Sequence, residues 1–171
     1  MTLRHQSASA AIALLITALV AGCSNGTSVK SPFSTKPPKL LDGPDYEVST
    51  GTVNGLGTVL IDGKGITIYM FATDIRGRPS RCYDICAVQW PPVVLPPGVT
   101  RPVVGTGIRA AMLGTAARTD GSVQVTYNGW PLYLWPPDKS PGQATGQALT
   151  NAGGLWYVLS PAGMPIMTPS P

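Results

Sequence analysis

The fold is decided by the stretch VLIDGKGITIYMFATD at residues 59–74, which returns 64 residues later as VQVTYNGWPLYLWPPD at residues 123–138. Each copy contains an apolar run, a tight turn and a second run, and each ends in an aspartate. In the second run of the first copy, apolar and other residues alternate, which is typical of a β-strand with two different faces. Repetition at a fixed spacing predicts a duplicated domain.

The turns support this interpretation. Asn128-Gly129 is the strongest short signal for a β-hairpin, because both central residues of that turn take positive φ. In the first copy, residues 62–65 form the predicted turn. Pro131 cannot donate to a ladder, so it marks an edge or the start of a strand.

Other strands are expected at 115–118, 122–127 and 155–159, and residues 108–113 form either a helical turn or a strand. Because isolated hairpins are marginal, the copies should share one core. We therefore predict an all-β domain over residues 48–167, with two pseudo-repeated antiparallel β-hairpin units packed together and little helix.

Composition agrees with this prediction. The 171 residues include 20 Gly and 18 Pro, which a mainly helical chain does not tolerate. The formal net charge is +4 and the basic residues are scattered along the chain, whereas a nucleic-acid footprint needs a dense basic face. No nucleic-acid partner is expected.

The N-terminal segment predicts a location. Residues 1–22 contain Arg4, then an apolar run too short to span a bilayer, then small residues before Cys23. This pattern predicts a lipoprotein signal peptide and a lipid on Cys23, and the alternative is an ordinary secretory leader. A lipid anchor makes the cell membrane the partner and puts the protein on its extracytoplasmic side. Residues 23–47 and 168–171 are predicted to be a disordered tether and a disordered tail.

Four motifs in order resemble a known family. They are the two Tyr-x-aromatic-x-x-Asp segments at 69–74 and 133–138, the stretch CYDICAVQWPP at 82–92, and VTYNGWPLY at 125–133. The chain is similar to the bacterial secreted-repeat lipoproteins, whose function is unknown. The resemblance implies a fold and an envelope location. It does not indicate any activity. Asp84 stands where members commonly have glycine.

Cys82 and Cys86 form an even pair in a domain expected to face an oxidising compartment, which predicts a disulfide. The alternative is a redox-active pair, although the spacing is not Cys-x-x-Cys and no βαβ pattern surrounds it. We expect no metal and no cofactor, because the only histidine is His5, in the predicted leader.

The duplicated motif has two interpretations. In the structural one, the aromatic residues staple the strands and each aspartate caps the following turn. In the functional one, two aromatic shelves with a carboxylate bind an envelope glycan or a small ligand. Buried rings favour the first and exposed rings the second. The candidate ligand-binding residues are Tyr69, Phe71, Asp74, Tyr133, Trp135 and Asp138.

These observations predict a membrane-anchored envelope lipoprotein of unknown biochemical activity, acting as a non-enzymatic binding or structural module. One alternative is an envelope redox or electron-transfer accessory protein, based on the cysteine pair and the aromatic density. Another is a hydrolase of wall polymer that uses Asp74 and Asp138 as its two carboxylates.

Overall fold

The computed structural model describes residues 39–169. The predicted signal peptide, Cys23 and residues 24–38 of the predicted tether lie outside this range. Among the described residues, no helix is long and apolar enough to cross a membrane. The elements, in chain order, are β1 Glu47–Val53, β2 Gly57–Asp62, β3 Ile68–Phe71, α1 Ile85–Gln89, β4 Val103–Val104, a 3-10 turn at Ala110–Met112, β5 Leu113–Ala117, β6 Val123–Tyr127, β7 Trp130–Pro131, β8 Tyr133–Leu134, β9 Thr150–Asn151 and β10 Gly154–Val158.

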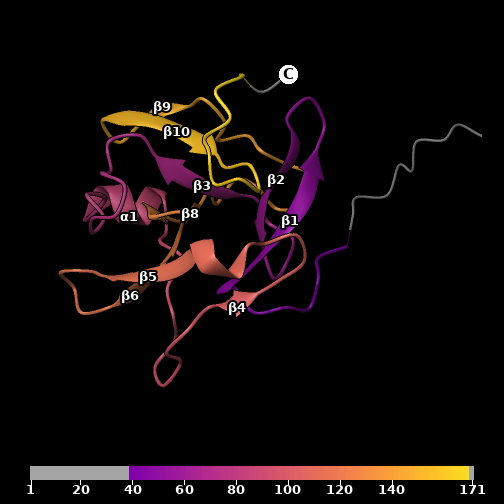
Figure 1. Ribbon diagram of the computed structural model, residues 1–171. Coiled ribbons are helices and arrows are strands. Elements are labelled where there is room, and N and C mark those ends of the chain that lie inside the picture. Colours follow the sequence, from indigo (N-terminus) through magenta and orange to yellow (C-terminus); the bar gives the residue numbers. More distant parts are fainter. Residues whose placement is uncertain (1–38, 170–171) are drawn as a thin grey trace, which may run out of the picture. The chain divides into compact units, whose positions relative to one another are not determined.

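The strands form three sheets (Figure 1), which confirms the all-β prediction. Their strand orders are β2-β1-β4, β8-β3-β10-β9 and β5-β6-β7. The antiparallel hairpins β1–β2 and β5–β6 correspond to each other in the two copies, and the second strand of each leads into the turn of a predicted hairpin, at 62–65 or 128–129. Residues 108–113, expected as a helical turn or a strand, end in the 3-10 turn and enter β5.

The Asn128-Gly129 hairpin is confirmed. These residues have φ of 49° and 79°, and β7 pairs with β6 across them. The turn at 62–65 differs, because β2 and β3 share only the isolated bridge between Ile61 and Thr67 before they enter different sheets. The chain therefore leaves the first hairpin to build the central sheet.

The central sheet has a core on each face. Tyr69 and Phe71 of β3 pack into one core, while Ile68 and Met70 pack into the other, as the alternation predicts. All four side chains are at most 3% exposed. A strand buried on both faces explains why the second run of the repeat carries so few charges.

The offset of 64 residues holds for the motif strands but is wrong by one residue in the strands before them. Leu60 and Val125 are structural equivalents. The N–H of Leu60 donates to the carbonyl of Leu159, and the N–H of Val125 donates to the carbonyl of Val93. Each acceptor lies three residues after a tryptophan. Both side chains pack in the same core. The first copy has one more residue in its turn, so an ungapped alignment of the two copies cannot match both strands.

The described start of the predicted tether contacts the domain. The N–H groups of Leu41 and Gly43 donate to the carbonyls of Lys64 and Gly63, both at 2.9 Å. A Cβ on Gly63 would lie 2.3 Å from a backbone oxygen of Pro44, so the two backbones can approach only with glycine there. Residues 41–47 therefore lie along the turn at 62–65 and lead into β1.

Candidate functional site

The two motif tyrosines lie opposite each other at the centre of the domain. Tyr69 on β3 and Tyr133 on β8 are direct partners in the antiparallel register, and both are fully buried. Antiparallel pairing of two equivalent strands places a local pseudo-twofold axis between these residues. The two copies of the motif therefore face one another across the axis.

Each tyrosine binds the aspartate of the other copy. The Tyr69 hydroxyl donates to Oδ2 of Asp138, and the Tyr133 hydroxyl donates to Oδ2 of Asp74, both at 2.6 Å. The aspartates are 5% exposed or less. The Tyr-x-aromatic-x-x-Asp motif is thus a reciprocal crosslink between the copies.

The second carboxylate oxygen holds the loop that follows each motif. Oδ1 of Asp74 accepts the N–H of Arg81 at 2.7 Å, and Oδ1 of Asp138 accepts the N–H of Thr145 at 2.9 Å. In both copies the donor lies seven residues after the aspartate. This is the turn-capping role of the structural interpretation.

The surroundings of the Tyr69 and Tyr133 hydroxyls determine which partner in each pair carries the proton. Burial raises the pKa of both phenols above their ordinary value, and the facing carboxylates raise it further. Burial also raises the pKa of the Asp74 carboxyl, against the opposing hydrogen bond from Tyr133. At neutral pH the tyrosines therefore keep their protons and act as donors.

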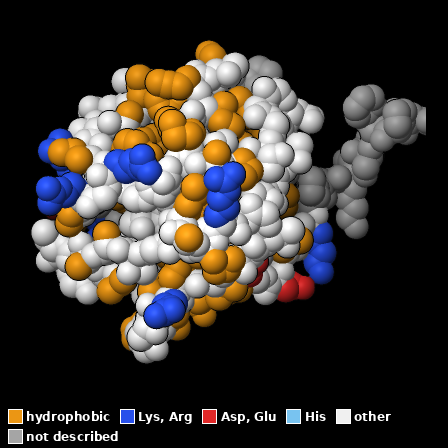
Figure 2. Space-filling view, viewed as in Figure 1, with side chains coloured by type: hydrophobic (Ala, Val, Ile, Leu, Met, Phe, Trp, Pro, Cys, Tyr) orange, Lys and Arg blue, Asp and Glu red, His pale blue; other side chains and the backbone are white. Residues whose placement is uncertain are grey.

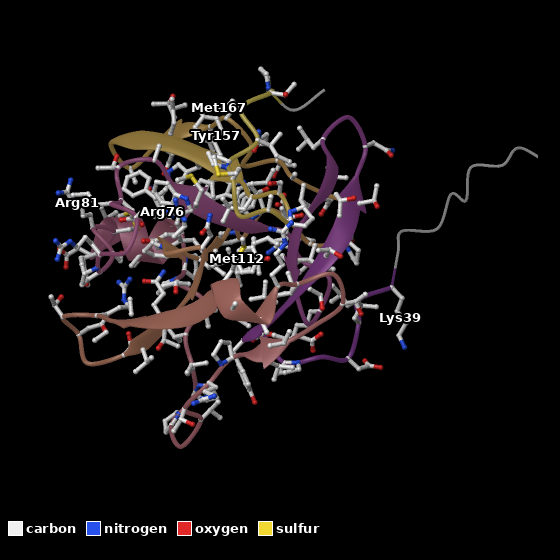
Figure 3. All side chains as sticks on the ribbon, in the orientation of Figure 1. Lys39, Arg76, Arg81, Met112, Tyr157 and Met167 are labelled. Atoms are coloured by element: carbon white, nitrogen blue, oxygen red, sulfur yellow. A yellow bond between two sulfur atoms is a disulfide. The ribbon has the colours of Figure 1, made fainter. Side chains whose placement is uncertain are left out.

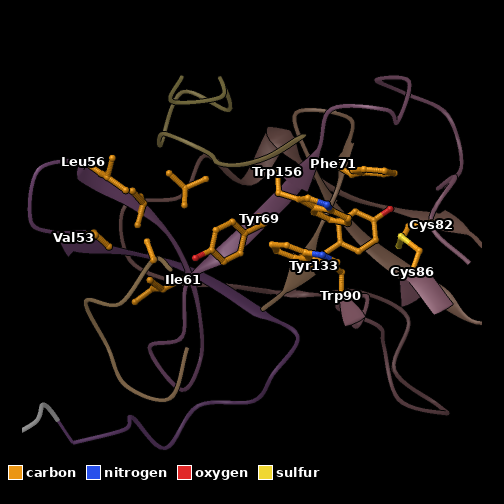
Figure 4. Packing of buried hydrophobic residues seen from close by; sticks show 13 residues of the cluster. Val53, Leu56, Ile61, Tyr69, Phe71, Cys82, Cys86, Trp90, Tyr133 and Trp156 are labelled. Atoms are coloured by element: carbon orange, nitrogen blue, oxygen red, sulfur yellow. A yellow bond between two sulfur atoms is a disulfide. The ribbon is translucent and has the colours of Figure 1, made fainter. Parts of the chain in front are cut away.

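A column of four aromatic rings crosses the same core, and Figure 4 shows three of its members, Phe71, Trp156 and Trp90. Trp90 and Trp156 stack at its centre with ring centroids 3.9 Å apart and planes 2° apart. Phe71 extends the column beyond Trp156 and Trp135 extends it beyond Trp90, each at 4.2 Å. The column obeys the same pseudo-twofold symmetry as the tyrosines. Each such pair contributes about 0.5–1.5 kcal/mol beyond burial.

The predicted disulfide between Cys82 and Cys86 is present, with a Cα–Cα distance of 5.2 Å. Helix α1 begins inside the loop, and the N–H of Trp90 donates to the carbonyl of Cys86 at 2.7 Å. The disulfide therefore fixes the turn that delivers Trp90 to the column. Asp84 in this loop has φ of 51° and ψ of −126°, a conformation that glycine adopts without strain.

Two polar residues missed by the sequence analysis support this site. Arg118, 5% exposed, donates to the carbonyl of Cys82 and to Oε1 of Gln124, both at 2.8 Å. Asn151 accepts the indole N–H of Trp90 at its side chain and that of Trp156 at its backbone, both at 2.9 Å. Neither residue belongs to a motif or a periodic pattern, so no local signal identifies them.

The six candidate ligand-binding residues are thus brought together, but they do not form an open shelf. Five are at most 5% exposed and Trp135 is half-buried. Their hydroxyl and carboxylate groups bind one another, and the rings of Phe71 and Trp135 stack on Trp156 and Trp90. By the criterion of ring burial, this geometry favours the structural interpretation of the motif.

Three hollows on the described surface lie elsewhere. One, of about 470 Å³, is lined by Arg76, Met112 and the Asn128-Gly129 turn; Figure 3 labels Arg76 and Met112. A second, of about 370 Å³, lies between residues 100–104 and β5, and a third, of about 550 Å³, lies under residues 94–99. None of the six candidate residues lines these hollows.

Two further observations concern possible metal ligands and basic side chains. Residues 39–169 hold no cluster of three or more His, Cys, Asp or Glu that could bind a metal ion. On the face seen in Figure 2, Lys and Arg side chains lie in several separate places.

Comparison with known proteins identifies the repeat. A family model described as a secreted repeat of unknown function matches residues 52–94 and 114–160, together just over half of the 171 residues. No curated protein and no solved structure matches the chain. The two matched segments contain β2 and β6, both tyrosine–aspartate motifs and both central tryptophans. The chain therefore belongs to the family of secreted repeats of unknown function.

Proposed function

We propose that this protein is a lipoprotein of the bacterial envelope, held at the membrane by a lipid on Cys23, and that its duplicated domain is a rigid, non-enzymatic binding module. The small residues before Cys23 support the anchor. The family description supports a location outside the cytoplasm. The disulfide between Cys82 and Cys86 agrees with an oxidising compartment.

One observation carries the role of the domain: the reciprocal bonds from Tyr69 to Asp138 and from Tyr133 to Asp74. They occupy the groups that would otherwise form a ligand shelf or a pair of catalytic carboxylates. Buried, fully bonded networks of this kind rigidify a core and specify a single structure. Binding then takes place at the periphery of the domain, on a surface that the crosslink holds in shape.

Metabolic labelling with an alkyne analogue of palmitate tests the anchor. We expect the full chain to take up label and to remain with the membrane fraction, and the Cys23→Ser variant to do neither. Ser24→Ala is the matched control and should behave like the wild type. Label retained by Cys23→Ser would contradict the proposed anchor.

A second candidate function, an envelope redox accessory, has one specific observation in its favour. Phe71, Trp156 and Trp90 of the column lie in the same core cluster as the Cys82–Cys86 disulfide (Figure 4). Reduction would take two electrons and two protons and yield two thiols. Titration of free thiols after mild reductant tests this role, and a disulfide that stays intact in the folded protein would eliminate it.

A further inference from the structure

In the first copy, the outer edge of the hairpin is covered. β4 runs parallel to β1, with Val48 opposite Val104. The N–H of Gly105 donates to the carbonyl of Val48 at 2.8 Å, and the N–H of Thr50 donates to the carbonyl of Thr106 at 2.9 Å. An extended segment therefore occupies the open side of β1 (Figure 1).

The second copy has an equivalent edge on β5. The hairpin turns correspond, because Leu56 donates to the carbonyl of Val53 as Gly121 donates to that of Arg118. Counting back along both strands from these turns, Val48 and Thr50 of β1 correspond to Leu113 and Thr115 of β5.

The peptide groups of Leu113 and Thr115 point away from β6. Arg118 bonds to Ser122 and Met112 bonds to Asn128, so the even-numbered residues of this segment face β6. β5 is the last strand of its sheet, and within residues 39–169 no strand pairs with its outer side. Among the described strands, β5 therefore has no counterpart of β4 on its outer side.

This edge lacks the usual protection. Strand edges in proteins are commonly blocked by charged residues, proline or bulges, yet β5 has the sequence LGTAA. Beside it lies the hollow of about 370 Å³, lined by Leu113, Gly114 and Thr115 on one wall and by Arg101 and Val104 among others on the opposite side. The lining is largely apolar and contains one basic residue and no acidic one, so it complements an apolar segment with a negative charge.

The covered edge also shows how the two edges differ. On β1, a Cβ on Gly105 would lie 1.7 Å from Oγ of Ser49, so the covering segment needs glycine there. The residue of β5 that corresponds to Ser49 is Gly114, which has no side chain to clash. A segment on β5 can therefore carry a side chain at the position that Gly105 takes on β1.

We propose that the outer edge of β5 is a strand-addition site for an extended segment of a partner protein. The segment runs parallel to β5, as β4 runs along β1, with β-branched residues facing Leu113 and Val104 and an acidic residue reaching Arg101. Backbone hydrogen bonds supply affinity in this mode of recognition, and alternate side chains supply specificity. This inference names the partner site of the binding module proposed above and rests on that role.

The test uses the full chain with Cys23→Ser and a labelled peptide, EPVVSTGI. Its sequence is that of residues 101–108 with Glu for Arg101 and Ser for Gly105. Thr115→Pro removes an outward N–H without touching the ladder to β6, and Thr115→Ala is the matched control that keeps the N–H. We expect Thr115→Pro to weaken binding, measured by fluorescence anisotropy, by about tenfold or more, and Thr115→Ala to change it by less than about threefold. Amide exchange should show new protection at Leu113 and Thr115.

The outcomes separate the site from the broader role. A phage-displayed peptide library selected on the same protein supplies the second measurement. Peptides that bind the wild type and Thr115→Pro equally, or that protect amides elsewhere, would overturn the β5 site and leave the binding module standing. If neither EPVVSTGI nor any selected peptide binds, the β5 site fails. If glycans and small ligands also fail to bind, the binding role fails with it.

Discussion

At the scale of single residues, the domain depends on a few buried polar groups that satisfy one another. Tyr69 and Tyr133 each donate to a carboxylate from the other copy, at 2.6 Å. Hydrogen bonds to charged groups are stronger than neutral ones, and a buried acceptor left without its donor costs free energy. A change in the motif is therefore expected to lower the free energy of unfolding.

Tyr133→Phe tests this expectation. The change removes one hydroxyl and leaves the buried Asp74 without its phenol donor, so the free energy of unfolding should fall by about 1–3 kcal/mol in urea denaturation. Tyr157→Phe is the control, because Tyr157 is also buried and its hydroxyl makes no hydrogen bond within residues 39–169. Equal losses in the two variants would mean that the crosslink contributes nothing.

Asp62 gives the domain a pH dependence. Burial raises the pKa of its carboxyl from 3.8 to about 6, against the hydrogen bonds from the N–H groups of Ile66 and Lys64. The folded state therefore holds this proton more tightly than the unfolded state. Its stabilising contribution is complete below pH 3.8 and is lost as the pH rises through about 6.

Asp62→Asn should remove this dependence while keeping an oxygen to accept both N–H groups. We expect the variant to match the wild type in stability near pH 4 and to exceed it near pH 8. Urea denaturation at both pH values measures the difference. A stability difference that does not change with pH would show that Asp62 titrates normally in the folded protein.

At the scale of elements, short strands and a short helix are held in place by their contacts with the rest of the domain. β3 and β8 contribute only four and two residues, yet their register sets the whole centre of the molecule. α1 has five residues and is closed by the disulfide, and Arg118 ties its loop to the β5–β6 hairpin. Elements this short are not stable alone, so their conformation reflects the contacts around them.

Asp84→Gly should stabilise the loop before α1. Asp84 has a positive φ that costs a non-glycine residue about 1–3 kcal/mol, and glycine relieves this strain at an entropic cost of about 0.5–1 kcal/mol. We expect a net gain of about 1 kcal/mol, seen as a higher Tm by calorimetry. Asp84→Ala removes the same charge but keeps a Cβ, so a similar gain in that variant would assign the effect to charge.

At the scale of the whole domain, the two copies do not form two separate bodies. β3 of the first copy pairs with β8 and β10 of the second, and Trp90 stacks on Trp156. The cores on both faces of the central sheet draw residues from both copies. Neither copy can bury its own apolar face, which is the usual reason that repeats depend on one another.

Separate expression of residues 39–107 and 108–169 tests this dependence. Each fragment alone should be unfolded by circular dichroism, because the first contains only β3 of the central sheet and the second lacks β3, which joins β8 to β10. An equimolar mixture should regain strand signal and the buried-tryptophan fluorescence of the intact domain. A folded 39–107 fragment would contradict the shared core.

Much of the fold could be predicted from local patterns. The alternation around Tyr69 and Phe71 assigned their faces, and Asn128-Gly129 assigned a turn, because both depend only on neighbouring residues. The path of the chain after Asp62 could not be predicted, since a tight turn with one bridge looks like a hairpin in the sequence. The candidate residues lie together in the structure, and their burial could not be predicted because it depends on elements that are distant in the sequence.

The sequence by itself determined that the domain is duplicated, that its strands alternate and that Cys82 and Cys86 pair. These properties follow from periodicity, turn chemistry and cysteine spacing, all of which are local. Only the tertiary structure decided that each tyrosine binds the aspartate of the other copy and that β5 keeps an open edge. Such facts depend on which strands pair across the molecule, and antiparallel pairing of β3 with β8 joins residues more than 60 positions apart.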